Sequence, residues 1–455
     1  MRQLKIGTSW VRGVVGEALT PELVVNFASA FGTWCDGRPV VIGRDTRRSS
    51  PALRAATIAG LLSTGCEVID LGVTPTPVVS FAVRELGIGG GISITGSHND
   101  ARWNALKFLG PDGALINQVK TEELLDIYHG SKFLLASWDQ LRPVDTCVDW
   151  LLDRYLEHLL SVLDVDAIRQ RTSRVLVDFC NGTCAPLASR FLAQLGCTLL
   201  QLNEEPSGEF AHAPAPTASN MRQLASLMRC VQADFGVAIN IDGDRIGFVT
   251  ADGIALSEEY ALPLTARIRL RRRAGPVVTN LSSSRMVEAV AAHFGQQVIR
   301  TSVGESHVID QGLAEGAVLA GEGSGGVAIL PSTMTFDALL TLGFILEELT
   351  LTGKSLNSAV AELPHYHMRK RHLPCPPNVV YRVLDRFRVY YEDSNPDCTD
   401  GIRLAWPDAW LHIRASNTEP ILRIIAEAET PARADEIMEQ AVTYARRAVF
   451  GHVEV

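Results

Sequence analysis

The chain has 455 residues, 46% hydrophobic and 20% charged, a composition typical of globular proteins. This length exceeds what one core usually serves and predicts roughly three or four domains. With 42 Lys and Arg against 51 Asp and Glu, the net charge of -9 disfavours binding to nucleic acid or to an anionic membrane surface. Because the sequence has neither an apolar run of about 18 residues nor a signal peptide, we expect a cytoplasmic protein without membrane contact.

A strand–helix–strand pattern occurs three times along the chain. Short strands rich in Val, Ile and Leu alternate with helices that end in glycine, which indicates mainly parallel sheets covered on both faces. The predicted strands are 39–45, 66–72 and 90–95, then 174–182 and 197–203, then 276–284 and 296–304. The predicted helices between them are 50–65, 77–87, 184–196 and 285–295.

The last part of the chain follows another pattern, because strands 410–414 and 421–429 are joined directly by a turn and precede a helix that Pro431 opens. We therefore predict three similar mixed or parallel α/β domains and a C-terminal α+β domain around a central cleft. The expected domains span residues 1–148, 149–250, 251–363 and 364–455.

Two groups of residues carry no predicted chemistry. The nine cysteines are scattered through apolar segments and suit the core of a protein in a reducing compartment. The segment 365–375, with three histidines and Cys375, is interpreted as a solvated linker rather than a metal site. The basic run 267–273 is expected to be a solvated helix end, where cations complement the helix dipole.

Ser97 lies in the polar loop ITGSHN, directly after a predicted buried strand, where backbone amides can meet a phosphate. A serine is a weak nucleophile alone, but a phosphoserine is a capable phosphoryl donor. His98 is its neighbour, and Lys107 is close enough in sequence to reach the same pocket. Lys107 could act as a general acid or base if neighbouring cations lower its pKa. The alternative is that this serine only stabilises the turn by hydrogen bonds to nearby backbone groups.

The loop NIDGDR, residues 240–245, follows the apolar strand FGVAI. Asp242 and Asp244 lie on one side of an extended chain, so both carboxylates can converge on Mg²⁺. Arg245 follows as a cation suited to phosphate. A solvated acidic turn is the alternative for an isolated Asp-Gly-Asp, and the flanking strand and arginine favour the metal site.

Two later loops offer ligand groups. Glu322 and Ser324, among the glycines of GEGSGG, suit vicinal sugar hydroxyls, although a flexible turn would explain them equally well. The loop RASNTEP has the composition of an anion-binding nest, with Arg414, Ser416, Asn417 and Thr418. Near the start of the chain, Arg12, Arg44 and Arg47 add cations to the first domain.

These motifs make the sequence similar to the α-D-phosphohexomutase superfamily. TGSHN resembles its phosphoserine loop, NIDGDR its DGDADR-type metal loop, GEGSGG its GEMSGH sugar loop and RASNTEP its RPSNTEP phosphate loop, in the same order. The opening GTSWVRG is similar to the family's GTSGIRG, so the resemblance spans the chain. It is nearest to archaeal-type members.

The resemblance implies that the four domains are, in chain order, the phosphoserine domain, the metal-binding domain, the sugar-recognition domain and the phosphate-binding domain. It also implies roles for the residues already named. Ser97 would carry the phosphoryl group and help bind Mg²⁺ with Asn240, Asp242 and Asp244. Arg12, His98 and Lys107 would lie in the catalytic centre. Arg245, Glu322 and Ser324 would bind the substrate. The distal phosphate would be held by Arg414, Ser416, Asn417 and Thr418.

Three positions depart from the family pattern. The first metal aspartate is Asn240, which keeps a carbonyl oxygen but lacks one negative charge, so Mg²⁺ should bind more weakly. The histidine that ends the sugar loop is replaced by Gly326. Asp100 takes the place of a proline and adds a negative charge near Ser97.

We expect a phosphohexomutase that interconverts hexose 6-phosphate and hexose 1-phosphate through a 1,6-bisphosphate intermediate. Glucose and mannose phosphates are the favoured substrates. Mg²⁺ and the bisphosphate activator would be its cofactors, and the protein would be a monomer or homodimer. Three alternatives stay open at this point: a phosphoglucosamine mutase, a degenerate sugar-phosphate-binding protein without turnover, and a bisphosphate synthase or phosphatase on the same scaffold.

Overall fold

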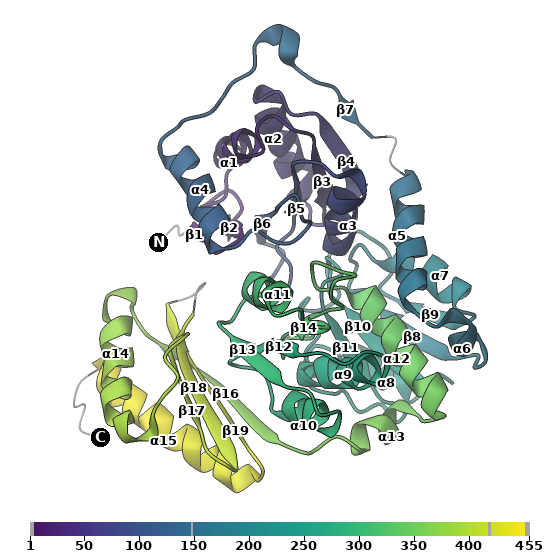
Figure 1. Ribbon diagram of the computed structural model, residues 1–455, viewed down its shortest axis with the longest axis vertical. Helices are drawn as coiled ribbons and strands as arrows, with labels where there is room; N and C mark the ends of the chain where they lie inside the picture. Colours follow the sequence, from purple (N-terminus) through teal and green to yellow (C-terminus); the bar gives the residue numbers. More distant parts are fainter. Residues whose placement is uncertain (1–3, 147–148, 417–419, 451–455) are drawn as a thin grey trace.

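The computed structural model describes residues 4–146, 149–416 and 420–450 and divides into four units (Figure 1). The first unit has a seven-stranded sheet in the order β1-β2-β6-β5-β3-β4-β7. Its strands are Lys5–Ile6 (β1), Trp10–Val14 (β2), Val40–Arg44 (β3), Val68–Val73 (β4), Gly90–Ile94 (β5), Trp103–Leu109 (β6) and Val144–Asp145 (β7). Its helices are Pro21–Trp34 (α1), Ser50–Ser63 (α2), Thr76–Leu86 (α3) and Gln118–His129 (α4).

In this sheet β3 runs parallel to β4 and β5, but β6 returns antiparallel beside β5 and β2. The return pairs Lys107 with Ser93 on one side and with Trp10 on the other. The side chain of Lys107 is thereby placed near the loop that follows β5, which is the loop of Ser97.

The second and third units share one topology, with three parallel strands and an antiparallel edge strand. The second sheet contains Arg174–Asp178 (β8), Thr198–Leu202 (β9), Phe235–Ile239 (β10) and Ile246–Val249 (β11). The third contains Val277–Asn280 (β12), Val298–Thr301 (β13), Leu319–Gly321 (β14) and Val327–Ala328 (β15). The predicted metal loop joins β10 to β11, and the predicted sugar loop joins β14 to β15. Both occupy the position that the serine loop has between β5 and β6.

Helices of the two middle units pack into one shared core. They are Asp149–Val162 (α5), Val165–Arg169 (α6), Ala185–Gln194 (α7), Ala261–Arg272 (α9), Met286–His293 (α10), Ala338–Thr352 (α12) and Leu356–Ala361 (α13). Two further helices, Arg222–Met228 (α8) and Glu305–Ala314 (α11), pack in smaller apolar clusters. Helix α12 lies at the centre of this core. A Cβ atom on its Gly343 would come within 2.4 Å of Leu163, so glycine allows the helices to approach closely.

The basic run 267–273 is not simply a solvated helix end, as the sequence had suggested. Arg267 and Arg269 are buried, and the Arg267 guanidinium pairs with the buried Glu348 of α12 at 2.8 Å. Arg272 pairs with Glu347 at 2.9 Å. The difference arises because α12 brings two carboxylates into the core, and buried carboxylates need cationic partners.

The C-terminal unit is an antiparallel sheet in the order β16-β19-β18-β17, covered by α14 (Pro377–Tyr390) and α15 (Pro431–Phe450). Its strands are His367–Pro374 (β16), Ile402–Ala405 (β17), Ala409–Ala415 (β18) and Ile421–Ala428 (β19). The interpretation of 365–375 as a linker was therefore wrong, because β16 pairs with β19 along its whole length. Its charged residues reflect a partly exposed edge strand.

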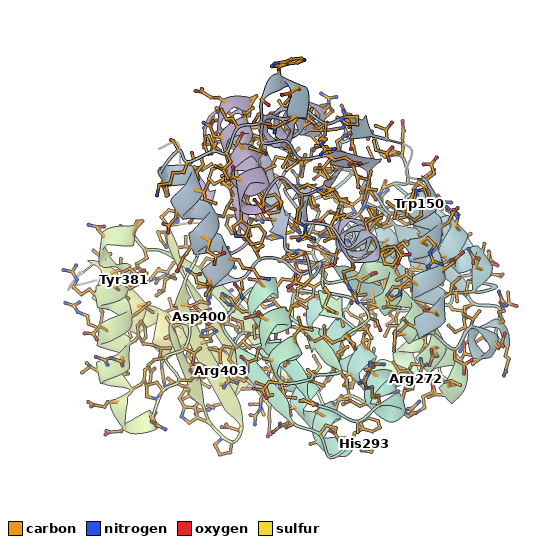
Figure 2. The ribbon with its side chains drawn as sticks, turned by 45° about the horizontal axis from the view of Figure 1, so that its top comes forward. Trp150, Arg272, His293, Tyr381, Asp400 and Arg403 are labelled. Carbon is orange, nitrogen blue, oxygen red and sulfur yellow. The ribbon has the colours of Figure 1, made fainter. Side chains whose placement is uncertain are left out.

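The C-terminal unit meets the third unit through individual polar contacts. Arg403 donates to the carbonyl of Leu281 at 3.1 Å, and His412 Nδ1 lies 2.8 Å from Ser282 Oγ. Figure 2 shows Asp400 and Arg403 on the side of the C-terminal sheet that faces the third unit. No helix within the described ranges has the length and apolar character needed to cross a bilayer. The cysteines that the structure describes are all free thiols.

Candidate active site

Ser97 lies in the loop after β5 with a left-handed backbone, at φ 47°, a conformation that costs free energy for residues other than glycine. Its side chain is almost fully buried, and its Oγ lies 3.5 Å from Oδ2 of Asp244 in the second unit. The backbone N–H of Ser97 donates to Thr95 Oγ1 at 2.9 Å. The loop therefore holds the hydroxyl at the boundary between the first two units.

Arg47 fixes this loop from behind. Its buried guanidinium donates to the backbone carbonyls of Ser97 and Asn99 at 2.9 and 2.7 Å, and also to that of Asp100. Asp45 orients Arg47 through an ion pair of 2.9 Å. The sequence identified Arg47 as one cation among several, but its structural contacts lie about fifty residues away and could not be predicted from spacing.

The carboxylates of Asp242 and Asp244 converge on Lys107 from the first unit. Lys107 Nζ lies 2.8 Å from Asp242 Oδ2 and 2.7 Å from Asp244 Oδ2, and all three side chains are buried. Thr76 of the first unit adds a hydrogen bond of 3.2 Å to Asp242. In the second unit, Gly243 has φ 72° and allows the tight bend between the two aspartates.

Lys107 was expected to act as a general acid or base if neighbouring cations lowered its pKa. Its closest charged neighbours are instead two carboxylates. Burial acts to lower the pKa of Lys107, but the carboxylates of Asp242 and Asp244 outweigh it and raise that pKa above its ordinary value. Burial acts to raise the pKa of Asp244, yet Lys107 and Arg245 lower it overall. Burial, together with the charge of Asp244, raises the pKa of Asp242. Lys107 is thus a strongly held ammonium in this arrangement.

Asn240 presents its nitrogen to the aspartates. The amide Nδ2 donates to Oδ1 of Asp242 at 2.8 Å and to Oδ1 of Asp244 at 2.5 Å. Its Oδ1 accepts the backbone N–H of Arg245 at 3.0 Å. The carbonyl oxygen that was expected to face a cation is therefore engaged elsewhere, because two neighbouring carboxylates attract the amide N–H groups.

The oxygen atoms of this loop suit a hard divalent cation. Buried carboxylates of Asp242 and Asp244, with the Ser97 hydroxyl beside them, provide the type of donor that Mg²⁺ prefers. Within the described residues there is no cluster of three His, Cys, Asp or Glu side chains able to hold a metal ion. A cation here would therefore depend on two carboxylates and on neutral or phosphate oxygens.

A cavity of about 170 Å³ opens above this cluster, lined by residues of all four units. These include Ser97, Lys107, Asp244, Glu305, Glu322 and Arg414. A second cavity of about 220 Å³ shares Arg245, Glu322 and Arg414 with it and reaches Ser324. The structure thus brings the serine, metal, sugar and phosphate loops to one continuous cleft.

The sugar loop is preorganised around Glu322. Oε1 of this carboxylate accepts the side-chain amide of Asn280 at 2.7 Å and the backbone N–H of Gly304 at 2.8 Å. Ser324 Oγ lies 3.4 Å from Oε2. Among the described residues Oε2 accepts fewer hydrogen bonds than Oε1, so it is the oxygen better suited to a ligand hydroxyl.

Three side chains of the cleft hold buried nitrogens without hydrogen-bond partners in the described structure. They are Nε of Arg12, Nε of Arg245 and Nδ1 of His98. Burial, followed by the charge of Arg245, lowers the pKa of Arg12 to about 10. Burial and the same two arginines lower the pKa of His98 well below its ordinary value. Crowded cations with unsatisfied donors are what a phosphate group would stabilise.

The phosphate loop reaches the cleft from the C-terminal unit. Arg414, at the end of β18, pairs with Asp400 at 3.0 Å, and Asp400 also accepts the backbone N–H of Val303 at 2.9 Å. Ser416 lines the same cavity. Asn417 and Thr418 lie outside the described residues. Arg423 and Glu305 also line the cleft, although no sequence motif had indicated them.

A serine held against paired carboxylates, below a cleft rich in cations, defines a phosphoryl-transfer enzyme for a polar phosphorylated ligand. The sequence matches the four domain descriptions of one family, Phosphoglucomutase/phosphomannomutase. Alpha/beta/alpha domains I, II and III match residues 3–134, 153–253 and 243–366, and the C-terminal domain matches residues 395–443.

Two relatives and one solved structure extend the comparison over the whole chain. A protein of Methanopyrus kandleri named "Probable phosphoglucosamine mutase" is 35% identical over 97% of this chain and 98% of its own length. A "Phosphoglucomutase/phosphomannomutase" of Thermococcus kodakarensis is 33% identical over 98% and 99%. The structure of a family protein from Burkholderia thailandensis has a TM-score of 0.85 at 27% identity, covering 98% of this chain and 97% of that one.

The chain belongs to the phosphoglucomutase/phosphomannomutase family of the α-D-phosphohexomutase superfamily. It is accordingly a phosphohexomutase, an isomerase that transfers a phosphoryl group within a phosphosugar. The fold class expected from the strand–helix pattern and the family expected from the four motifs are confirmed.

Proposed function

We propose that the protein interconverts a hexose 6-phosphate and its 1-phosphate, with Ser97 as the phosphoryl carrier and a hexose 1,6-bisphosphate as the intermediate. One observation carries the proposal. The buried Ser97 hydroxyl lies 3.5 Å from Asp244 at the base of a cleft to which all four units contribute. A phosphoryl group on Ser97 in that position would be presented to a sugar in the cleft while the rest of the loop stays fixed.

The residues of the first two units would serve the transferred group. Asp242, Asp244 and the oxygen on Ser97 would hold Mg²⁺, which when bound supplies positive charge to the transferred phosphoryl group. Lys107 and Arg245 would contribute cationic donors beside it. Arg12 and His98 would complete the surroundings of the phosphoserine, since both have buried nitrogens that lack partners.

The third and fourth units would bind the parts of the sugar that do not react. Glu322 and Ser324 would accept and donate to sugar hydroxyls, while Arg414 and Ser416, with Asn417 and Thr418, would hold the distal phosphate. A site that binds a phosphate at one end and hydroxyls in the middle would bind the 1,6-bisphosphate in either of its two orientations. Reorientation of that intermediate would expose the second phosphate to Ser97.

Glucose and mannose phosphates are the substrates that we propose first. The name of the Thermococcus kodakarensis relative supports them, whereas the name of the Methanopyrus kandleri relative supports glucosamine phosphate as the second candidate. The amide of Asn240 beside the two carboxylates favours a third candidate, a sugar-phosphate-binding protein without turnover.

A panel of hexose 1-phosphates tests these candidates directly. The wild-type protein is assayed for formation of the corresponding 6-phosphates with Mg²⁺ and a trace of hexose 1,6-bisphosphate. Turnover with glucose or mannose phosphate supports the proposed function, and preferential turnover of glucosamine phosphate changes the substrate. Binding of all three without any product contradicts the enzymatic proposal and supports the binding protein.

A further inference from the structure

Glu305 is the one acidic side chain of α11 that lines the catalytic cavity among the described residues. It is the first residue of that helix and shares the cavity with Ser97, Lys107 and Asp244. One carboxylate oxygen, Oε1, accepts the backbone N–H of Phe336 at 2.8 Å. This contact orients the carboxyl group of Glu305 at the wall of the cavity.

The cavity position changes the acidity of Glu305. Burial is the main cause that raises its pKa to about 8, and the charge of Asp244 adds to it. Lys107 from β6 and Arg245 from the metal loop act in the opposite direction. The other titratable or charged groups that line this cavity are His98, His307, Glu322, Arg12, Arg414 and Arg423. A carboxyl group that titrates near neutral pH is well matched to accept and return a proton.

The other groups near the serine are less suited to this task. Lys107 is held by two carboxylates, at 2.8 and 2.7 Å, which favour its charged form. Gly326 is the position at which the family carries histidine, and here no side chain fits. A Cβ atom at Gly326 would lie 2.1 Å from Cδ2 of Phe336. The same Phe336 orients Glu305 through its backbone, so packing that excludes one side chain positions another.

We infer that Glu305 is the proton-transfer residue of this cleft, an inference that rests on the function proposed above. As the sugar hydroxyl attacks phosphoserine 97, a sugar O–P bond forms and the P–Oγ bond breaks. The hydroxyl proton passes to the Glu305 carboxylate, and Ser97 Oγ leaves with the electron pair. In the second half, Ser97 Oγ attacks the other phosphate. The departing sugar oxygen then takes the proton back from Glu305, which restores both residues.

Glu305→Gln is the informative substitution, because glutamine keeps an oxygen that can accept the Phe336 N–H but cannot carry the proton. We expect kcat to fall by roughly 100-fold or more, with hexose phosphate affinity and thermal stability close to wild type. The kcat/KM of the wild type should fall as the pH is lowered through the pKa of Glu305, and this dependence should disappear in the variant. Glu305→Asp should restore part of the activity and the pH dependence.

Glu315→Gln is the matched control, since Glu315 is exposed at the other end of α11 and should leave kcat unchanged. Glu305→Gln with near-normal kcat, or with low kcat and an unaltered pH profile, would overturn the inference. Loss of the pH dependence in His307→Gln but not in Glu305→Gln would assign the proton to His307 instead. Absence of turnover in the wild type would refute the proposed function itself, so the two failures are distinguishable.

Discussion

The two ends of the cleft hold their functional residues by different means. At the serine end, Lys107 bridges the first and second units through buried ion pairs to Asp242 and Asp244, and Arg47 fixes the serine loop. At the phosphate end, Arg414 lies on an antiparallel sheet that meets the third unit mainly through single polar contacts. The first end is preorganised for chemistry, whereas the second is suited to binding. Changes at the first should therefore reduce turnover or stability, and changes at the second should reduce affinity.

The largest effect is expected for Ser97→Ala. Removing the Oγ atom removes the proposed phosphoryl carrier, so turnover of hexose phosphates should be abolished while the phosphate loop still binds them. Steady-state assays with isothermal titration calorimetry separate the two quantities. Residual turnover near the wild-type rate would show that another group carries the phosphoryl group.

Arg47→Met tests how far the serine end depends on its buried support. The substitution leaves the buried carboxylate of Asp45 without its ion pair and removes three contacts to the serine loop. The free energy of unfolding should decrease by about 3–5 kcal/mol. Denaturant unfolding gives this value, with Arg48→Met as the control, because the Arg48 side chain is 77% exposed. Equally small decreases in the free energy of unfolding of both variants would show that the serine end does not depend on its buried ion pair.

Arg414→Ala tests the other end. The loss of a charge-assisted phosphate contact should weaken hexose phosphate binding by about 1.5–3 kcal/mol. Ser97 should still be phosphorylated at high bisphosphate concentration. Titration calorimetry measures the affinity, and Arg388→Ala on the exposed face of α14 is the control. Unchanged affinity for both hexose phosphates would remove Arg414 from the binding site.

Asn240→Asp should have the smallest effect and tests how residue 240 influences metal binding at the serine end. The substitution replaces N–H donors to Asp242 and Asp244 with a third carboxylate. Without metal, the added repulsion should lower stability, and Mg²⁺ should stabilise the variant more than the wild type. The Mg²⁺ concentration for half-maximal activity should decrease. Melting temperature and activity are both measured as Mg²⁺ is titrated. If these titrations coincide for the wild type and the variant, Asn240 does not limit metal binding.

The sequence predicted the features that depend on local pattern. Apolar runs before Ser97 and Asn240 correspond to β5 and β10, and the polar loops after them reach the cleft. Strand β16 was missed because its exposed positions are charged, which conceals the alternation of a strand. The domain limits set from the sequence stay predictions.

Features that depend on contacts distant in sequence could not be predicted. The orientation of the Asn240 amide depends on where both aspartates and the Arg245 backbone lie. Glu305 had no motif, because its significance depends on Phe336, thirty-one residues away, and on the charges of Lys107 and Asp244 in the same cavity. Such residues become visible only when the fold brings separate units together.

The central claim is that Ser97 carries the phosphoryl group between the two ends of a hexose. It is tested most directly by treating the protein with hexose 1,6-bisphosphate, removing the donor and adding excess hexose 1-phosphate. Peptide mass spectrometry should first find one phosphoryl group on the peptide that contains Ser97. That group should then be lost as hexose 1,6-bisphosphate appears in solution. A phosphoryl group on another peptide, or one on Ser97 that hexose phosphate does not remove, would contradict the account.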